Sequence, residues 1–377
     1  MKIALLTNIV APYRFDSYSA LHHHARNAGG GLTVICTNRT EPQRNWPDRT
    51  PPFAQINLAG LNLYLGENRN LTFPVGVTKA IRKTRPDILI LAGFGMAQWR
   101  ARNLAAQSGI PVIVQFDGWS ASDALYDNPV RRFIRRQMVR TADGHIAAST
   151  RSKDWFATLG AKTEDILVSP IPVSFGNDAI PVGLSNRGFF ERPFDLVWCG
   201  RTTRRKGFDT FLEIAATLVR SNIVHKISIV GCTDTGQIKD RLCHTGLADI
   251  TQIWGQLPPA QLPAHLGAAR LCLFPSNNDA YGLGVVEAIA CGAVALASDA
   301  VGCAPDILDP DDTLLANTPS AWVSACSNLL RNPDLWHQTR QRQASRITAN
   351  TARHHAETLW QAVCRGIARH RGHCQWN

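Results

Sequence analysis

The chain has 377 residues, of which 45% are hydrophobic and 18% are charged. This composition is ordinary for a globular protein and excludes a mainly disordered, collagen-like or coiled-coil chain. The length predicts two domains, and the net charge of +11 predicts an anionic partner.

Short apolar runs alternate with helix-like stretches in the first half of the chain. Val, Ile and Leu dominate these runs, which is typical of the buried strands of a parallel sheet covered by helices. The predicted strands are residues 3–7, 32–36, 88–91, 112–115, 146–148 and 166–169. The first run is too short for the core of a signal peptide, so we expect a cytoplasmic chain. An α/β domain is predicted over residues 1–180.

A basic helix is predicted at residues 130–140, within the half of the chain that carries most of the excess positive charge. Apolar residues 130, 133, 134 and 138 are expected to share one face, with arginines on both sides. Such a helix can lie on an anionic membrane surface, here the inner face of the membrane. The alternative is a solvated helix that packs on its own domain.

A second α/β series follows a stretch rich in Pro and Gly at residues 169–188, where we place the hinge. Its predicted strands are residues 196–199, 227–230, 251–254, 271–274 and 293–297, with a helix at 209–219. We therefore predict two doubly wound Rossmann-like α/β domains facing across a cleft, with the second over residues 181–350. A C-terminal amphipathic helix, about 351–377, is expected to pack back onto the first domain.

Neither a membrane span nor a metal site is expected. No apolar run reaches the roughly 20 residues that a bilayer span needs. Three consecutive histidines, residues 22–24, stand out in the sequence. Successive residues of a helix point about 100° apart, so these three side chains do not converge on one ion.

Two acids and a turn of small residues follow the predicted strand 271–274. Asp279 lies in a polar loop, and Glu287 lies one turn into the helix that begins after the turn. The amide end of such a helix favours a phosphate. Glu287 would repel a phosphate, but its carboxylate can accept hydrogen bonds from both hydroxyls of a ribose.

Cations follow the first strand of the second domain. Arg201 and Lys206 lie in a basic loop after residues 196–199. Ligands of open α/β sheets bind at the carboxyl ends of the strands, so these cations are placed to neutralise a diphosphate. Together with the helix end and the acids, they predict a nucleotide site.

These residues resemble the retaining glycosyltransferases of family 4, which have the GT-B fold and transfer a sugar from a nucleoside diphosphate donor. The motifs that carry the resemblance are Gly200-Arg201, Lys206-Gly207, the strand before Gly231, Pro275-Ser276 and the acid pair, here Asp279-x7-Glu287. The family has Glu at the first acid and Phe-Gly where this chain has Tyr281-Gly282. The resemblance covers the second half and is weaker in the first. It implies retention at the anomeric centre, and neither a cofactor nor a metal.

The resemblance also implies a role for each matching residue. Arg201 and Lys206 would hold the donor diphosphate, Glu287 the ribose and Asp279 the transferred sugar. The nucleobase would lie near Trp254, Gly255, Gln256 and Leu257. The other implied donor-binding residues are Gly200, Tyr281, Gly282, Leu283 and Gly284.

The first half departs from the family pattern. Many members have paired glycines after the first strand, whereas this chain has residues 8–14 ending in Arg14, which resembles a subgroup that acts in cell-surface polysaccharide synthesis. The acceptor is therefore expected to be a saccharide, lipid-linked or free. Asp117 stands near the family's His-Asp, and Arg14, Gly95 and Asp117 are the acceptor-side candidates. Arg201, Lys206, Asp279 and Asp117 are the candidate catalytic residues.

Two other functions stay open. A nucleotide-sugar epimerase has two such domains as well, and would release no nucleoside diphosphate in response to an acceptor. A basic nucleic-acid-binding protein would explain the charge, but the sequence has no recognition motif, and phosphate contacts alone bind unselectively. We expect no nucleic-acid partner.

Overall fold

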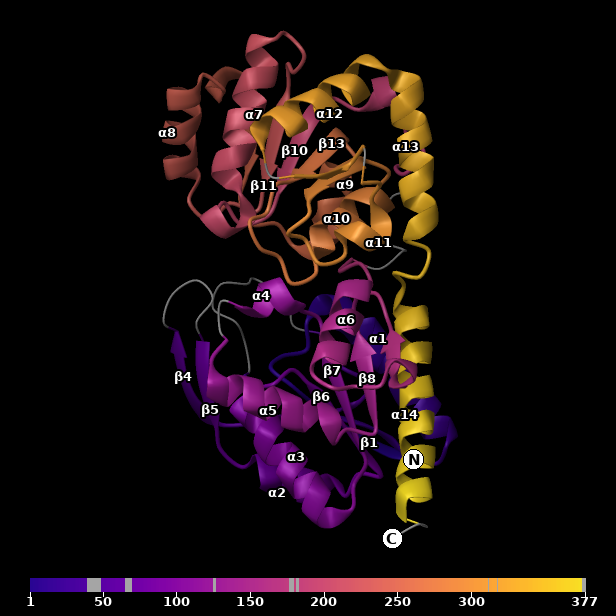
Figure 1. Ribbon diagram of the computed structural model, residues 1–377. Helices are drawn as coiled ribbons and strands as arrows, with labels where there is room; N and C mark the ends of the chain where they lie inside the picture. Colours follow the sequence, from indigo (N-terminus) through magenta and orange to yellow (C-terminus); the bar gives the residue numbers. More distant parts are fainter. Residues whose placement is uncertain are drawn as a thin grey trace. The chain divides into compact units, whose positions relative to one another are not determined.

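The computed structural model describes residues 1–38, 49–64, 70–124, 127–175, 180, 183–310, 312–316 and 318–374 (Figure 1). The chain forms two compact units, one of Met1–Pro172 with Ala352–Asn377 and one of Val173–Thr351. The boundary therefore lies before residue 180, and residue 181 is outside the described residues. The C-terminal segment belongs to the first unit.

The first unit contains a sheet of seven parallel strands in the order β3-β2-β1-β6-β7-β8-β9. The strands are β1 (Lys2–Thr7), β2 (Gly31–Cys36), β3 (Ala54–Asn57), β6 (Ile88–Ala92), β7 (Val112–Phe116), β8 (Gly144–Ala147) and β9 (Ile166–Val168). The six predicted strands are confirmed. The structure adds β3 and an antiparallel hairpin of β4 (Gly60–Tyr64) and β5 (Asn70–Pro74).

Helices cover both faces of this sheet, as the alternation of side chains in its central strand requires. The helices are α1 (Pro12–Asn27), α2 (Val77–Thr84), α3 (Met96–Ser108), α4 (Ser120–Ala124), α5 (Pro129–Arg140), α6 (Thr150–Thr158) and α14 (Ala352–Cys374). Ile3 and Leu5 of β1 pack in one apolar cluster with residues of α1 and α14. Ala4 and Leu6 pack in another cluster with residues of α2, α3 and α6.

The C-terminal helix α14 completes the core of the first unit. Leu359 and Val363 are fully buried in the cluster that contains α1. Trp360 stacks on His24 of α1 with ring centroids 5.6 Å apart. These apolar residues have helical spacing, so the helix buries one stripe and leaves the opposite face polar.

The basic helix α5 differs in part from its predicted face. Met138 is buried, and Ile134 packs against the core, but Val130 and Phe133 are 67% and 60% exposed. Arg135 is instead buried and pairs with Asp123 of α4 at 2.5 Å. The helix therefore turns one arginine inward and leaves two apolar residues in solvent.

The second unit contains six parallel strands in the order β12-β11-β10-β13-β14-β15. They are β10 (Phe194–Cys199), β11 (Ile227–Val230), β12 (Thr251–Trp254), β13 (Ala269–Phe274), β14 (Val294–Ser298) and β15 (Leu314–Leu315). The helices are α7 (Phe208–Arg220), α8 (Thr235–Thr245), α9 (Leu262–Leu266), α10 (Leu283–Ala290), α11 (Ala304–Ile307), α12 (Pro319–Arg331) and α13 (Pro333–Arg346). The five predicted strands are confirmed, and β15 is additional.

Gly207, the N-cap of α7, lies where only glycine fits. Its φ is +78°, and a Cβ there would lie 1.7 Å from the carbonyl oxygen of Pro275. The contact brings the turn after β10 against the segment after β13. Gly246 has a similar φ of +70°, but open space surrounds its missing Cβ.

We predict that Gly207→Ala destabilises the protein much more than Gly246→Ala. Gly246→Ala forces a side chain into the left-handed region, at a cost of about 1 kcal/mol. Gly207→Ala adds a clash with backbone and should cost at least about 2 kcal/mol more. Denaturant unfolding of both variants measures the difference, and equal losses of free energy would contradict the close approach.

Candidate functional site

The predicted nucleotide-site residues lie at the carboxyl edge of the second sheet. In that sheet, the chain leaves β10 on one side for β11 and returns on its other side as β13. Such a switch point leaves a crevice between the two connections, where ligands of open α/β sheets bind. The basic turn after β10 and the acidic loop after β13 flank this point.

Hydrogen bonds join the basic turn to the acidic loop. Asn277 donates from its backbone N–H to the carbonyl of Arg205 at 2.9 Å, and from its side chain to the carbonyl of Arg204 at 2.7 Å. Arg205 donates from its guanidinium to the carbonyl of Asn278 at 3.3 Å. The two segments are 73 residues apart in the sequence and form one bonded unit.

Lys206 and Asp279 form an ion pair across this junction. Lys206 ends a 3-10 turn, Arg204–Lys206, that Thr203 caps by accepting from the Lys206 N–H. Asp279 is held by its backbone, which donates to the carbonyl of Ala300 at 3.0 Å. The pair is mostly shielded from solvent, with 26% of the Lys206 and 14% of the Asp279 side chain exposed. The structure therefore brings together two of the predicted catalytic residues.

The N-terminus of α10 follows the same loop. Its N-cap, Gly282, has φ +94°, and a Cβ there would lie 2.2 Å from the side chain of Val301. A Cβ on Gly284 would lie 2.8 Å from the ring of Phe274. Leu283 and Gly284 are the first two residues of α10, where backbone N–H groups have no partner within the helix. The turn thus supplies the amide end that the sequence predicted.

Glu287 is buried in the second turn of α10 and is bound by a residue that sequence analysis missed. Ser174 donates to Glu287 Oε1 from its hydroxyl and, at 3.2 Å, from its backbone N–H. Burial raises the pKa of Glu287 to about 6, although the bonds from Ser174 and the charge of Lys206 act in the opposite direction. Ser174 accounts for one carboxylate oxygen.

Tyr281 also binds a residue that the sequence did not indicate. Its buried hydroxyl accepts a hydrogen bond from the side-chain amide of Asn350 at 2.7 Å. A Phe at this position, as in the family pattern, would leave that amide without this acceptor. The hydroxyl therefore ties the loop before α10 to the end of the second unit.

Three glycines follow three adjacent strands at this edge. They are Gly200 after β10, Gly231 after β11 and Gly255 after β12. Gly200 donates to the carbonyl of Val230 at 2.9 Å, and Gly231 donates to the carbonyl of Gly255 at 3.1 Å. A Cβ on Gly231 would lie 3.1 Å from the carbonyl oxygen of Gly200. At these three positions the edge of the sheet therefore carries backbone without side chains.

The predicted nucleobase residues lie at the far end of this glycine row. Trp254 is 38% exposed and meets His265 edge-on, with ring centroids 4.6 Å apart. Gln256 is exposed and Leu257 is half-buried. The nucleobase candidates thus lie two strands away from β10.

Arg201, a diphosphate candidate, directly follows Gly200 and is half-buried. Its carbonyl accepts a hydrogen bond from the Thr203 N–H at 2.9 Å.

In the first unit, two acceptor-side candidates meet at the carboxyl edge of the sheet. Arg14 of α1 donates to Asp117 Oδ1 at 2.6 Å, directly after β7. Arg14 is buried, whereas 37% of the Asp117 side chain is exposed. Gly95, the third candidate, follows the neighbouring strand β6 and is the N-cap of α3. It is exposed and is not part of the contact between Arg14 and Asp117.

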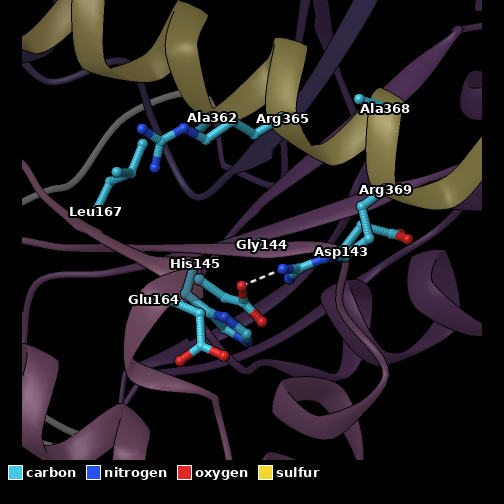
Figure 2. Close-up of a pocket in the computed structure, with 10 residues that line it drawn as sticks. Asp143, Gly144, His145, Glu164, Leu167, Ala362, Arg365, Ala368 and Arg369 are labelled. Carbon is cyan, nitrogen blue, oxygen red and sulfur yellow. Dashed lines mark hydrogen bonds and ion pairs between the residues drawn. The ribbon is translucent and has the colours of Figure 1, made fainter. Parts of the chain in front are cut away.

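A cavity of about 260 Å³ lies at the opposite edge of the first sheet, between the starts of β8 and β9 and helix α14 (Figure 2). Arg369 of α14 pairs there with Asp165, and His370 Nδ1 lies 3.1 Å from Asp143 Oδ1. These contacts attach the end of α14 to the sheet.

Among the described residues, no group of three or more His, Cys, Asp or Glu could hold a metal ion, and no helix is long and apolar enough to span a bilayer.

Two protein-family models match the chain, one in each half. Residues 193–332 match the family described as glycosyl transferases group 1. Residues 19–172 match the glycosyl transferase 4-like domain. Both units are therefore recognised, including the first unit, where the sequence motifs are weaker.

Curated relatives match part of the chain. The D-inositol 3-phosphate glycosyltransferase of Segniliparus rotundus is 29% identical over 146 residues, which are 37% of this chain and 32% of that protein. The enzyme of the same name from Kineococcus radiotolerans is 25% identical over 54% of this chain and 53% of that protein. The chain thus spans about a third to a half of the length of these relatives.

Solved structures match over almost the whole chain. Sucrose-phosphate synthase of Thermosynechococcus elongatus has a TM-score of 0.71 at 18% identity and covers 98% of this chain and 99% of its own. Anabaena HepE in complex with UDP has a TM-score of 0.72 at 15% identity, covering 97% and 100%. The predicted GT-B fold is confirmed.

Proposed function

Because this chain belongs to the glycosyl transferases of group 1, we propose that it moves a sugar from a nucleoside diphosphate sugar to a saccharide acceptor, with retention at the anomeric centre. The observation that carries the proposal is the joined site around Lys206, Asp279 and the N-terminus of α10. It offers a cation, an acid for sugar hydroxyls and an amide end for phosphate within one hydrogen-bonded unit.

The donor fits along the carboxyl edge of the second sheet. A base stacks on exposed Trp254, and the nucleotide crosses the bare backbone at Gly231 and Gly200. The diphosphate reaches Arg201, Lys206 and the amides that begin α10, and Glu287 accepts from the ribose. HepE, which shares the fold, is described in complex with UDP and with UDP-glucose, which supports a nucleoside diphosphate sugar as the donor.

Charge at the leaving group accounts for the catalytic role of the cations. Breaking the bond between sugar and phosphate places negative charge on the diphosphate, and cations fixed near it stabilise that transition state more than the ground state. Lys206 pairs with Asp279. The diphosphate competes for the ammonium group, and Asp279 becomes available to the hydroxyls of the transferred sugar.

The acceptor is proposed to approach the carboxyl edge of the first unit. Asp117 presents a partly exposed carboxylate there that Arg14 holds from its buried side. A saccharide hydroxyl can donate to that carboxylate. The resemblance of residues 8–14 to enzymes of cell-surface polysaccharide synthesis favours a lipid-linked acceptor.

Helix α5 supports docking on an anionic membrane surface. Val130 and Phe133 project into solvent beside Arg131, Arg132 and Arg136, which are exposed as well. Apolar side chains that enter the headgroup region together with cations bind anionic lipid, at about 1 kcal/mol for each cation near the surface. This surface supports a location at the membrane face where lipid-linked acceptors are found.

An acceptor-dependence assay tests the proposed function. The protein is incubated with nucleoside diphosphate sugars, with and without lipid-linked saccharides, and free nucleoside diphosphate is measured. A transferase releases it in response to the acceptor. Release of epimerised nucleotide sugar without any acceptor would instead indicate an epimerase, and no reaction with any nucleotide sugar would overturn both.

We predict that Lys206→Ala lowers turnover about a hundredfold, equivalent to roughly 3 kcal/mol of transition-state stabilisation. The physical reason is the loss of the cation at the leaving diphosphate. Lys239→Ala, an exposed lysine of α8, serves as the control and should turn over normally. Steady-state transfer rates decide the matter, and full activity of Lys206→Ala would refute its role.

We predict that donor binding weakens as the pH falls through about 6, the raised pKa of Glu287. The ionised carboxylate accepts from the ribose, so affinity should be roughly tenfold lower at pH 5 than at pH 7. The stability of the fold has the opposite pH dependence. Folding raises the pKa of Glu287, so the protonated form of Glu287 stabilises the folded protein. The free energy of unfolding therefore declines as the pH rises between the pKa of the unfolded state and that of the folded state.

Calorimetric titration with an intact nucleotide sugar measures this dependence. A free nucleoside diphosphate is unsuitable, because its terminal phosphate titrates near pH 6 as well. Glu287→Gln should bind weakly and without this pH dependence. A wild-type affinity that stays constant from pH 5 to 7 would contradict the assignment.

We predict that replacing Val130 and Phe133 with Ser releases the protein from anionic liposomes. The wild-type protein should sediment with vesicles that contain anionic lipid and stay in solution with neutral ones. Phe190→Ser removes an aromatic residue that is 80% exposed in the second unit, and this control should bind as the wild type does. Equal retention of the wild type by both kinds of vesicle would rule out this surface.

A further inference from the structure

A buried chain of polar side chains leads from helix α14 to Asp117. Ser169, directly after β9, lies 2.6 Å from His355 Nδ1 through its hydroxyl oxygen. His355 Nε2 is hydrogen-bonded to the guanidinium of Arg14, and the same guanidinium nitrogen lies farther away, 3.5 Å, from His355 Nδ1. A second guanidinium nitrogen of Arg14 binds Asp117. Three members of this hydrogen-bonded series are buried, namely Ser169, His355 and Arg14. Asp117 is therefore the member that faces solvent.

The contacts of Arg14 indicate the tautomer of His355. A guanidinium can only donate, so it needs an unprotonated ring nitrogen, and its shorter contact is with Nε2. We therefore assign the ring proton to Nδ1, which donates it to the Ser169 hydroxyl. Burial, Arg14 and His354 hold the pKa of His355 well below its usual range, which keeps the ring neutral. Neutral His355 is thus an acceptor in fixed orientation for Arg14.

The hydrogen bonds of Arg14 do more than attach helix α14 to the sheet. Arg14 uses separate nitrogens for His355 and Asp117, so its planar fork fixes the direction of the Asp117 carboxylate as well as its position. The residues come from the first turns of α1 and α14 and from the ends of β7 and β9, and all lie at the carboxyl edge of the sheet.

We propose that His355 and Ser169 are positioning residues for sugar transfer: they orient Arg14, and Arg14 holds the Asp117 carboxylate towards the acceptor hydroxyl. The inference rests on the proposed function, since it assigns Asp117 to the acceptor. It extends the acceptor site to α14, the helix that returns to the first unit at the end of the chain.

The test separates acceptor use from donor binding and from stability. His355→Leu removes the acceptor for Arg14, while His355→Gln keeps an amide oxygen that can replace Nε2. We expect His355→Leu to lower kcat/KM for the acceptor about tenfold to a hundredfold, the usual effect of misplacing a reacting group. Affinity for the nucleotide sugar, measured by calorimetry, should stay within roughly twofold because the donor binds the second unit. His355→Gln should restore most of the lost acceptor kcat/KM.

His370→Leu is the matched control. It removes another histidine by which α14 binds the first unit, His370 with Asp143, at the opposite edge of the sheet. It should lower the Tm without changing kcat/KM for the acceptor. If His355→Leu folds poorly, Ser169→Ala gives the same test, since it releases the ring without opening a large cavity.

Two failures are distinguishable. A wild-type protein that transfers no sugar from any nucleotide sugar overturns the proposed function itself. A wild type that transfers sugar, together with His355→Leu or Ser169→Ala variants that keep the full acceptor kcat/KM and change only the Tm, overturns the positioning role.

Discussion

The ion pair between Lys206 and Asp279 is the interaction on which the candidate donor site depends. It joins the turn after β10 to the loop after β13, at the point where the second sheet reverses its strand order. Gly207 allows the two segments to approach, and the hydrogen bonds of Asn277 keep them together. The pair therefore holds a cation next to an acid in a partly buried site. The attraction between the Lys206 ammonium and a diphosphate would be stronger in such a site than in water.

The strands and the donor site could be predicted because their signals are local. Buried parallel strands give continuous apolar runs, and the glycines, cations and acids of the second unit follow those runs at short spacing. Strand β3 was not predicted because three of its four residues are exposed and the fourth, Ile56, is only half-buried, so it gives no apolar run. The face of α5 was predicted only in part, because the partner that draws Arg135 inward, Asp123, lies in another helix.

Two hydrogen-bonded contacts between distant segments could not be predicted. Ser174 lies in a stretch without periodicity and is 113 residues from Glu287. His355 is a polar residue in the first turn of an amphipathic helix, 341 residues from Arg14. Nothing in their neighbours marks either residue, and only the fold shows that each one forms a hydrogen bond with a buried charged group. Such groups need partners because burial without them costs several kcal/mol.

The return of α14 to the first unit constrains how this protein can be divided or recombined. Residues 1–172 by themselves would expose the apolar surface that Leu359 and Val363 cover, and would leave Arg14 without His355. A first unit that folds by itself must therefore contain Met1–Pro172 together with Ala352–Asn377, for instance as a circular permutant. Chimeras that exchange the first unit between relatives should carry helix α14 along with the amino-terminal segment.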